Sequence, residues 1–127
     1  VTMAAKGGSG SYAANTGKYY TSGFEWRAYQ SDTEATIVVA AAEGLTIATV
    51  KITYVTKNGG ILVCNSANVE SAAVVTVNAA SATFTIANTG TATNGQIKVT
   101  EIEVVYGGDE TQVRSEFKLT SWRDFTI

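Results

Sequence analysis

Six aromatic side chains lie close together near the start of the chain, beside a glutamate and an arginine. They are Tyr12, Tyr19, Tyr20, Phe24, Trp26 and Tyr29, with Glu25 and Arg27 among them. Flat apolar rings can cover the C–H faces of sugar rings, and planar guanidinium or carboxylate groups hydrogen-bond to sugar hydroxyls. This combination favours a carbohydrate-binding surface. The residues predicted to bind ligand are Tyr19, Tyr20, Arg27 and Tyr29.

Two interpretations of this segment remain open, because the residues of a strand alternate between its two faces. Phe24 and Trp26 share one face, and Glu25 and Arg27 share the other. In the first interpretation, Phe24 and Trp26 fill a protein core while Glu25 and Arg27 face water. In the second, part of the aromatic set stays on the surface and contacts the ligand.

The chain contains no histidine, which removes the commonest general base of enzymes. Serine–histidine and cysteine–histidine nucleophile systems are therefore excluded. Cys64 is the only cysteine, so no disulfide forms within the chain. Because it lies in the apolar run 61–64, we predict a small buried hydrophobe rather than a reactive thiol. We predict a protein that is not an enzyme and has no catalytic residues.

Charge and hydropathy argue against several classes of partner. Nine basic and eleven acidic residues are spread along the chain, so no basic stripe marks a nucleic-acid site. No apolar run reaches the ~18 residues of a membrane span. The pairs Asp32–Glu34 and Asp109–Glu110 offer oxygen ligands for a structural calcium ion, but neither matches a calcium-loop pattern. We predict no metal site and no cofactor, with calcium at these pairs as the alternative.

Short runs of alternating apolar residues, separated by turn residues, make up most of the chain. The predicted strands are 24–29, 35–41, 45–55, 61–64, 74–77, 82–87 and 97–106. Connections such as Asn58-Gly59 and Asn94-Gly95 tolerate the positive φ of tight hairpin turns. This spacing predicts an all-β fold, an antiparallel two-sheet β-sandwich that is jelly-roll-like and has about eight strands.

One strand pattern occurs twice. Residues 45–54 read LTIATVKITY and residues 97–106 read IKVTEIEVVY, with apolar residues at the first, third, sixth, eighth and tenth positions of both. Strict alternation cannot keep all five on one face, so each copy needs one extra residue, at 48–49 and at 100–101. The extra residue is either a β-bulge or a point where the chain crosses between sheets. The repeat reflects an internal duplication or a shared structural need, and we expect the tyrosine that ends each copy to close an equivalent edge of the core.

The segment after Gly107-Gly108 is rich in large apolar residues, which disordered tails seldom carry. Many of them share one parity, so one face of an extended segment would be apolar. The segment either returns to its own domain as an edge strand or adds to the sheet of a second copy. The residues predicted to mediate assembly are Phe117, Leu119, Trp122, Phe125 and Ile127.

The order of these motifs resembles a β-sandwich module that recurs in secreted proteins and lipoproteins of gut anaerobic bacteria. The resemblance covers residues 11–106 and rests on KYY (18–20), FEWRAY (24–29), GLTIATVKITY (44–54) and NGQIKVTEIEVVY (94–106). It implies an extracellular or cell-surface module that is non-catalytic and binds a glycan or another cell-surface ligand. It carries no site residues of its own.

We expect a single domain over residues 1–127, with its core in 11–106 and a C-terminal extension over 107–127. Two functions are compatible with these features. The first is a non-catalytic extracellular binding module for a carbohydrate or cell-surface ligand. The alternative is a structural, self-assembling subunit of a pilus, filament or virion surface, whose tail adds to a neighbouring sheet.

Overall fold

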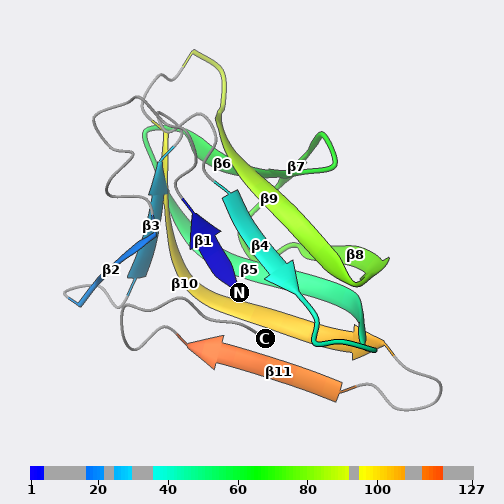
Figure 1. Cartoon of the computed structure of the whole chain (residues 1–127). Coiled ribbons are helices and arrows are strands. Elements are labelled where there is room, and N and C mark those ends of the chain that lie inside the picture. The colour runs from blue at the N-terminus through cyan, green and yellow to red at the C-terminus, as the bar shows by residue number, and fades with distance from the viewer. Residues whose placement is uncertain (5–16, 22–24, 30–35, 92–94, 108–112, 119–127) are drawn as a thin grey trace.

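The computed structural model of the chain describes residues 1–4, 17–21, 25–29, 36–91, 95–107 and 113–118. These residues form eleven strands and no helix (Figure 1). The strands are β1 (Thr2–Ala4), β2 (Lys18–Tyr20), β3 (Glu25–Tyr29), β4 (Thr36–Ala40), β5 (Thr46–Lys57), β6 (Gly60–Cys64), β7 (Ala67–Val69), β8 (Val74–Ala79), β9 (Ser81–Asn88), β10 (Gln96–Gly107) and β11 (Val113–Lys118). Accordingly, this part of the chain holds no helix that could span a membrane.

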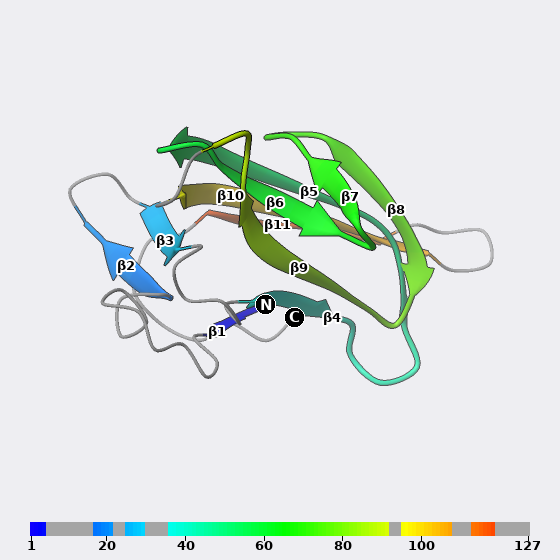
Figure 2. The ribbon, with the colours of Figure 1, turned by 90° about the horizontal axis from the view of Figure 1, so that it is seen from above.

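The strands make two antiparallel sheets that pack against each other (Figure 2). The first sheet has the order β1-β4-β9-β6-β7, and the second has the order β2-β3-β10-β5-β8, with β11 also paired to β10. The antiparallel pairs β3–β10, β4–β9, β5–β8 and β6–β7 nest inside one another along the chain. A long hairpin rolled up in this way is a jelly roll, so the predicted fold is confirmed.

The seven predicted strands are all present, and their ends differ from the prediction by at most two residues. The prediction missed β1, β2 and β7, since three residues are too few to show an alternating pattern. It was also wrong about Leu45, which is 46% exposed and does not share the buried face. The Leu45 N–H donates to the Ala42 carbonyl (3.0 Å), so this residue belongs to the turn before β5.

The two copies of the repeated pattern are β5 and β10, and they pair with each other along their whole length. Thr100 is an extra residue on β10, because Val99 and Glu101 on either side of it pair with the adjacent residues Tyr54 and Thr53 of β5. Ala48 is an extra residue on β5, because the pair formed by Thr49 is followed directly by the pair formed by Ile47. Both predicted bulges are therefore present. Neither strand crosses between sheets.

The faces of β5 and β10 that point toward the other sheet are buried. The buried apolar residues of these strands are Ile47, Val50, Ile52, Tyr54, Ile97, Val99, Ile102, Val104 and Tyr106. Across the sandwich they belong to one core cluster with Ile37, Val39, Leu62 and Phe84 of the first sheet. Leu45 apart, every apolar position of the doubled pattern is thus in the core.

Tyr54 joins the two sheets through its hydroxyl group. The hydroxyl donates to the Val69 carbonyl of β7 (2.5 Å) and accepts from the Leu62 N–H of β6 (3.4 Å). Burial is the main reason why the pKa of Tyr54 is raised; the hydrogen bond from Leu62 lowers it, and the charge of Glu70 raises it. Tyr106 is equally buried, but no hydrogen bond of its hydroxyl is found among the described residues. The two tyrosines are therefore not equivalent.

The strand β10 has β5 along one edge, while two strands share its other edge. Residues 96–99 pair with β3, and residues 101–106 pair with β11. The partner on this edge changes at the Thr100 bulge. A bulge bends its strand, so the two halves of this edge face different neighbours. Residues 113–118 thus return to their own domain, as the first alternative for the tail requires. Residues 119–127 lie outside the described part of the chain.

Candidate functional site

The hairpin formed by β2 and β3 holds two of the predicted ligand-binding residues against each other. Tyr20 pairs with Glu25 and Lys18 pairs with Arg27, so Tyr20 and Arg27 are diagonal neighbours on one face. The Arg27 guanidinium lies over the Tyr20 ring, 3.7 Å from its centroid. The start of the hairpin is held where the Gly17 N–H donates to the Arg27 carbonyl (2.9 Å). This contact between a cation and an aromatic ring orients both side chains.

Tyr19 does not belong to the same face as Tyr20. Because adjacent strand residues alternate, its ring points inward and packs against the hydrophobic core. Its hydroxyl is buried and finds no hydrogen-bond partner in the described structure. The prediction grouped Tyr19 with Tyr20 because β2 was not recognised as a strand. Tyr29 is placed only by its backbone, which pairs with Gln96 of β10.

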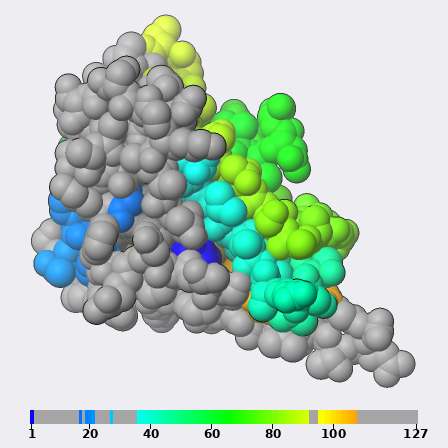
Figure 3. All heavy atoms as spheres, in the orientation of Figure 1, coloured from blue at the N-terminus to red at the C-terminus, as the bar shows by residue number. Residues whose placement is uncertain are grey.

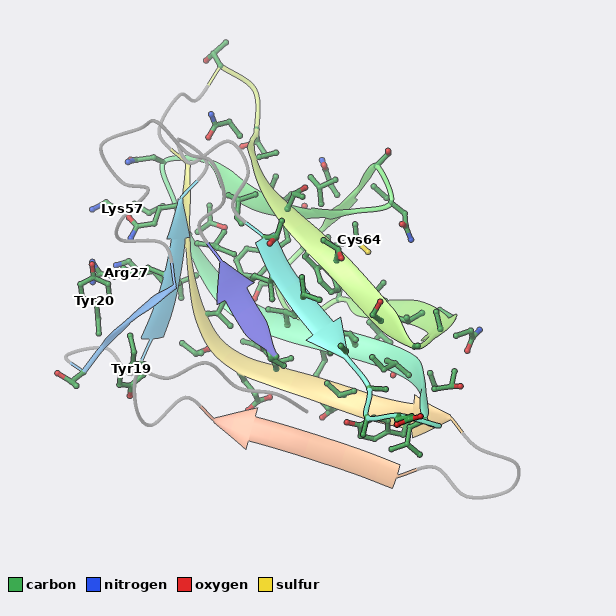
Figure 4. The ribbon with its side chains drawn as sticks, viewed as in Figure 1. Tyr19, Tyr20, Arg27, Lys57 and Cys64 are labelled. Atoms are coloured by element: carbon green, nitrogen blue, oxygen red, sulfur yellow. The ribbon has the colours of Figure 1, made fainter. Side chains whose placement is uncertain are left out.

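Two lysines that the sequence analysis did not single out lie on the outer face of the same sheet. Lys98 of β10 pairs with Arg27 on one side and with Val55 of β5 on the other. Lys57 follows two residues after Val55, so it shares that face. Figure 4 shows Lys57, Arg27 and Tyr20 on the same side of the molecule. In the sequence each lysine looks like any solvated strand residue, and only strand pairing brings it near Arg27.

The acidic side chains of β10 lie farther along the strand. Glu101 and Glu103 follow the Thr100 bulge, and Glu103 forms a salt bridge with Lys51 of β5 (3.7 Å). The outer face of this sheet therefore has a basic end, near Lys98, and a stretch of mixed charge beyond the bulge. An anionic ligand is attracted to the basic end.

A separate cleft of about 340 Å³ opens at the other side of the sandwich. It lies between the turn that follows β6, the edge strand β8 and the start of β9, and Figure 3 shows the surface indented there. Its lining residues are Cys64, Asn65, Val75, Thr76, Val77, Ala79, Ser81, Ala82 and Thr83. Cys64 is 6% exposed, which confirms that it is buried, and burial raises the pKa of its thiol. Figure 4 places Cys64 far from Tyr20 and Arg27.

The remaining site predictions fall largely outside the described residues. The acidic pairs Asp32–Glu34 and Asp109–Glu110 are among these, and no group of three or more metal-binding side chains occurs in the part of the chain that is described. Phe117 is placed by its backbone, which pairs with Ile102. The other residues predicted to mediate assembly, Leu119, Trp122, Phe125 and Ile127, also lie outside.

Comparisons with protein-family models, with curated proteins and with solved structures found no match to this chain. The resemblance to the β-sandwich module of gut anaerobic bacteria therefore stays a prediction from the sequence motifs.

Proposed function

We propose that this chain is a non-catalytic, extracellular or cell-surface binding module whose ligand is a carbohydrate that carries carboxylate or sulfate groups. The observation that carries the proposal is the stack of Arg27 on Tyr20, on the outer face of a sheet and beside Lys98. The extracellular setting rests on the motif resemblance alone.

The chemistry of the stack favours an acidic ligand over a neutral one. The guanidinium is planar and always charged, and its N–H donors can bind both oxygens of a carboxylate once the Tyr20 ring holds it in place. Lys98 and Lys57 add positive charge on the same face. Because Arg27 covers one face of the Tyr20 ring, the sugar is held mainly by polar contacts rather than by stacking on that face.

The experiment is a calorimetric titration of the full chain. One titration uses an acidic oligosaccharide, oligogalacturonate, and the other uses a neutral cello-oligosaccharide. We expect only the acidic sugar to bind, and added salt to weaken the binding. Arg27→Ala should reduce the affinity by about tenfold or more, because it removes charge-assisted hydrogen bonds. Lys51→Ala is the matched control: it removes a cation from the same sheet, at the Glu103 salt bridge.

Three results would overturn the proposal. Neither sugar binds, or both bind equally well, or Lys51→Ala weakens binding as much as Arg27→Ala does. Circular dichroism of each variant shows whether the fold is retained before the affinities are compared.

The second candidate function is a self-assembling structural subunit of a pilus, filament or virion surface. One observation favours it: β7 and β8 each end a sheet, and no described strand pairs with their outer edges. Unpaired edges offer backbone hydrogen-bonding groups to the strand of another chain.

A further inference from the structure

The cleft beside β8 opens at the edge of the sandwich and reaches residues of the hydrophobic core. Val75 and Val77 of β8 are half-buried and pack against the core, while Val74 and Thr76, which alternate with them along the strand, are exposed. On the first sheet the cleft ends at Ala82 and Cys64, which are buried. The strand β7 has only three residues, and it is the last strand of that sheet on this side.

No charged residue lines the cleft. Its lining mixes apolar side chains, such as Val75 and Val77, with uncharged polar ones, such as Asn65 and Ser81. The site therefore favours an uncharged group, since an ion would lose its hydration without gaining a partner. The neighbouring edge of β8 adds a second requirement, because among the described strands β8 pairs only with β5. Its outer edge can hydrogen-bond to the backbone of an extended chain. An edge beside an uncharged cleft matches the recognition of a strand, whose backbone pairs while alternate side chains enter pockets.

We propose that the edge of β8 and this cleft bind the C-terminal segment, residues 119–127, of a second copy of the chain. In that segment Leu119, Phe125 and Ile127 share one parity with Ser121 and Arg123, so an extended backbone turns Phe125 and Ile127 to one side with no charged residue between them. Such a strand can place large apolar side chains in the cleft while its backbone pairs with β8. The inference rests on the second candidate function and is independent of the carbohydrate proposal.

Geometry favours a second copy over the chain's own tail. The strands β10, β5 and β8 lie between β11 and a strand on the outer edge of β8, so the segment would have to cross four strand spacings, ~19 Å. Pairing along the six residues of β8 takes a further ~20 Å. Nine extended residues span at most ~30 Å, which is less than the sum of these lengths. A segment from another copy has no such limit.

The test uses Cys64 as a reporter, because it is the only thiol in the chain and lines the cleft. The rate at which a thiol reagent modifies Cys64 is measured over about a hundredfold range of full-chain concentration, beside the molar mass from light scattering. We expect the mass to rise with concentration. The modification rate should fall about fivefold at ten times the midpoint concentration of assembly.

Three variants locate the contact. Val77→Lys places a charge at the cleft and should abolish both effects, whereas Val74→Lys, on the outward face of the same strand, should leave both in place. Phe125→Asp changes the proposed segment without changing any residue of the described strands, and it should also abolish both effects. Circular dichroism confirms the fold of each variant, and Phe125→Asp remains decisive if Val77→Lys does not fold.

Several results would overturn the inference. The chain stays monomeric over the whole range, or it assembles without protecting Cys64. Equal assembly by the Val77→Lys and Val74→Lys chains would place the contact elsewhere. Protection of Cys64 by an added small apolar molecule, but not by a higher protein concentration, would make the cleft a small-ligand site. A failed sugar titration has no bearing on any of these readings, so the two proposals fail separately.

Discussion

Ile52 of β5 lies directly opposite Ile102 of β10, between a bulge at Ala48 on one strand and a bulge at Thr100 on the other. Each bulge adds one residue to its own strand. Because both strands gain one residue, buried residues of β5 stay opposite buried residues of β10 on both sides of the Ile52–Ile102 pair. The doubled sequence pattern is therefore one antiparallel ladder in which each copy is the partner of the other.

Deletion of Thr100 should be tolerated, because it removes the extra residue and leaves Val99 and Ile102 on the buried face. Deletion of Glu103, three residues later, should instead turn Val104 and Tyr106 outward and expose them. At ~2 kcal/mol for each buried side chain, this second deletion should cost about 4 kcal/mol or more. Urea unfolding of both proteins checks the prediction, and equal losses in the two deletions would refute it.

Tyr54→Phe should lower the free energy of unfolding by about 2 kcal/mol, since the Val69 carbonyl and the Leu62 N–H lose a buried partner. Tyr106→Phe is the control. It removes the hydroxyl of an equally buried side chain for which the described residues show no hydrogen bond, so its cost should stay below about 1 kcal/mol. Urea denaturation measures both values, and a cost for Tyr106→Phe that matches Tyr54→Phe would contradict the prediction.

The raised pKa of Tyr54 also predicts a loss of stability at high pH. The native state holds the phenolic proton more tightly than the unfolded state, chiefly because of burial. Below pH 10 both states keep the proton and the full stability is present; as the pH rises above 10 the unfolded state ionises first and stability falls. Unfolding curves at several pH values should show a smaller decline in Tyr54→Phe than in the parent chain. An identical decline would mean that other groups cause it.

The turns before and after β6 offer a reciprocal pair of substitutions. Asn58-Gly59 and Asn65-Ser66 both have positive φ at their two residues, 54° and 74° in the first turn and 51° and 65° in the second. A non-glycine residue is strained in this region, so Ser66→Gly should stabilise the protein by about 0.5–1 kcal/mol. Gly59→Ser should destabilise it by a similar amount. The urea midpoints measure both, and shifts of the same sign would contradict this explanation.

Two glycines should respond to alanine for different physical reasons. A Cβ on Gly60 would lie 2.6 Å from the Gln96 backbone nitrogen, so Gly60→Ala forces two strands apart and should cost about 2–3 kcal/mol. Gly44 has a φ of 83° and no atom within 4 Å of an added Cβ, so Gly44→Ala should cost only about 1 kcal/mol of backbone strain. Thermal unfolding ranks the two, and a larger loss at Gly44 would reverse the argument.

Much of the fold could be predicted because the residues of a strand alternate between apolar and polar according to which face is buried. The alternation in β5 and β10 identifies the buried face, and the break in that alternation locates both bulges. Asn58-Gly59 marks a hairpin because its chemistry suits positive φ. Short elements carry too little of this information. The strand β2 was missed, and with it the fact that Tyr19 and Tyr20 point to opposite faces.

Most of the residues that face the core, the turns and the extra residues in β5 and β10 could be predicted from the sequence, because these properties depend on near neighbours along the chain. The side-by-side order of the strands depends on contacts between distant segments, so it is known only from the three-dimensional arrangement. The pairing of Arg27 with Lys98, the hydrogen bond from Tyr54 to Val69 and the cleft beside Val77 all join residues from separate strands. The alternation of apolar and polar residues predicts which face of the sheet a side chain is on, but it does not predict which strand lies next to it.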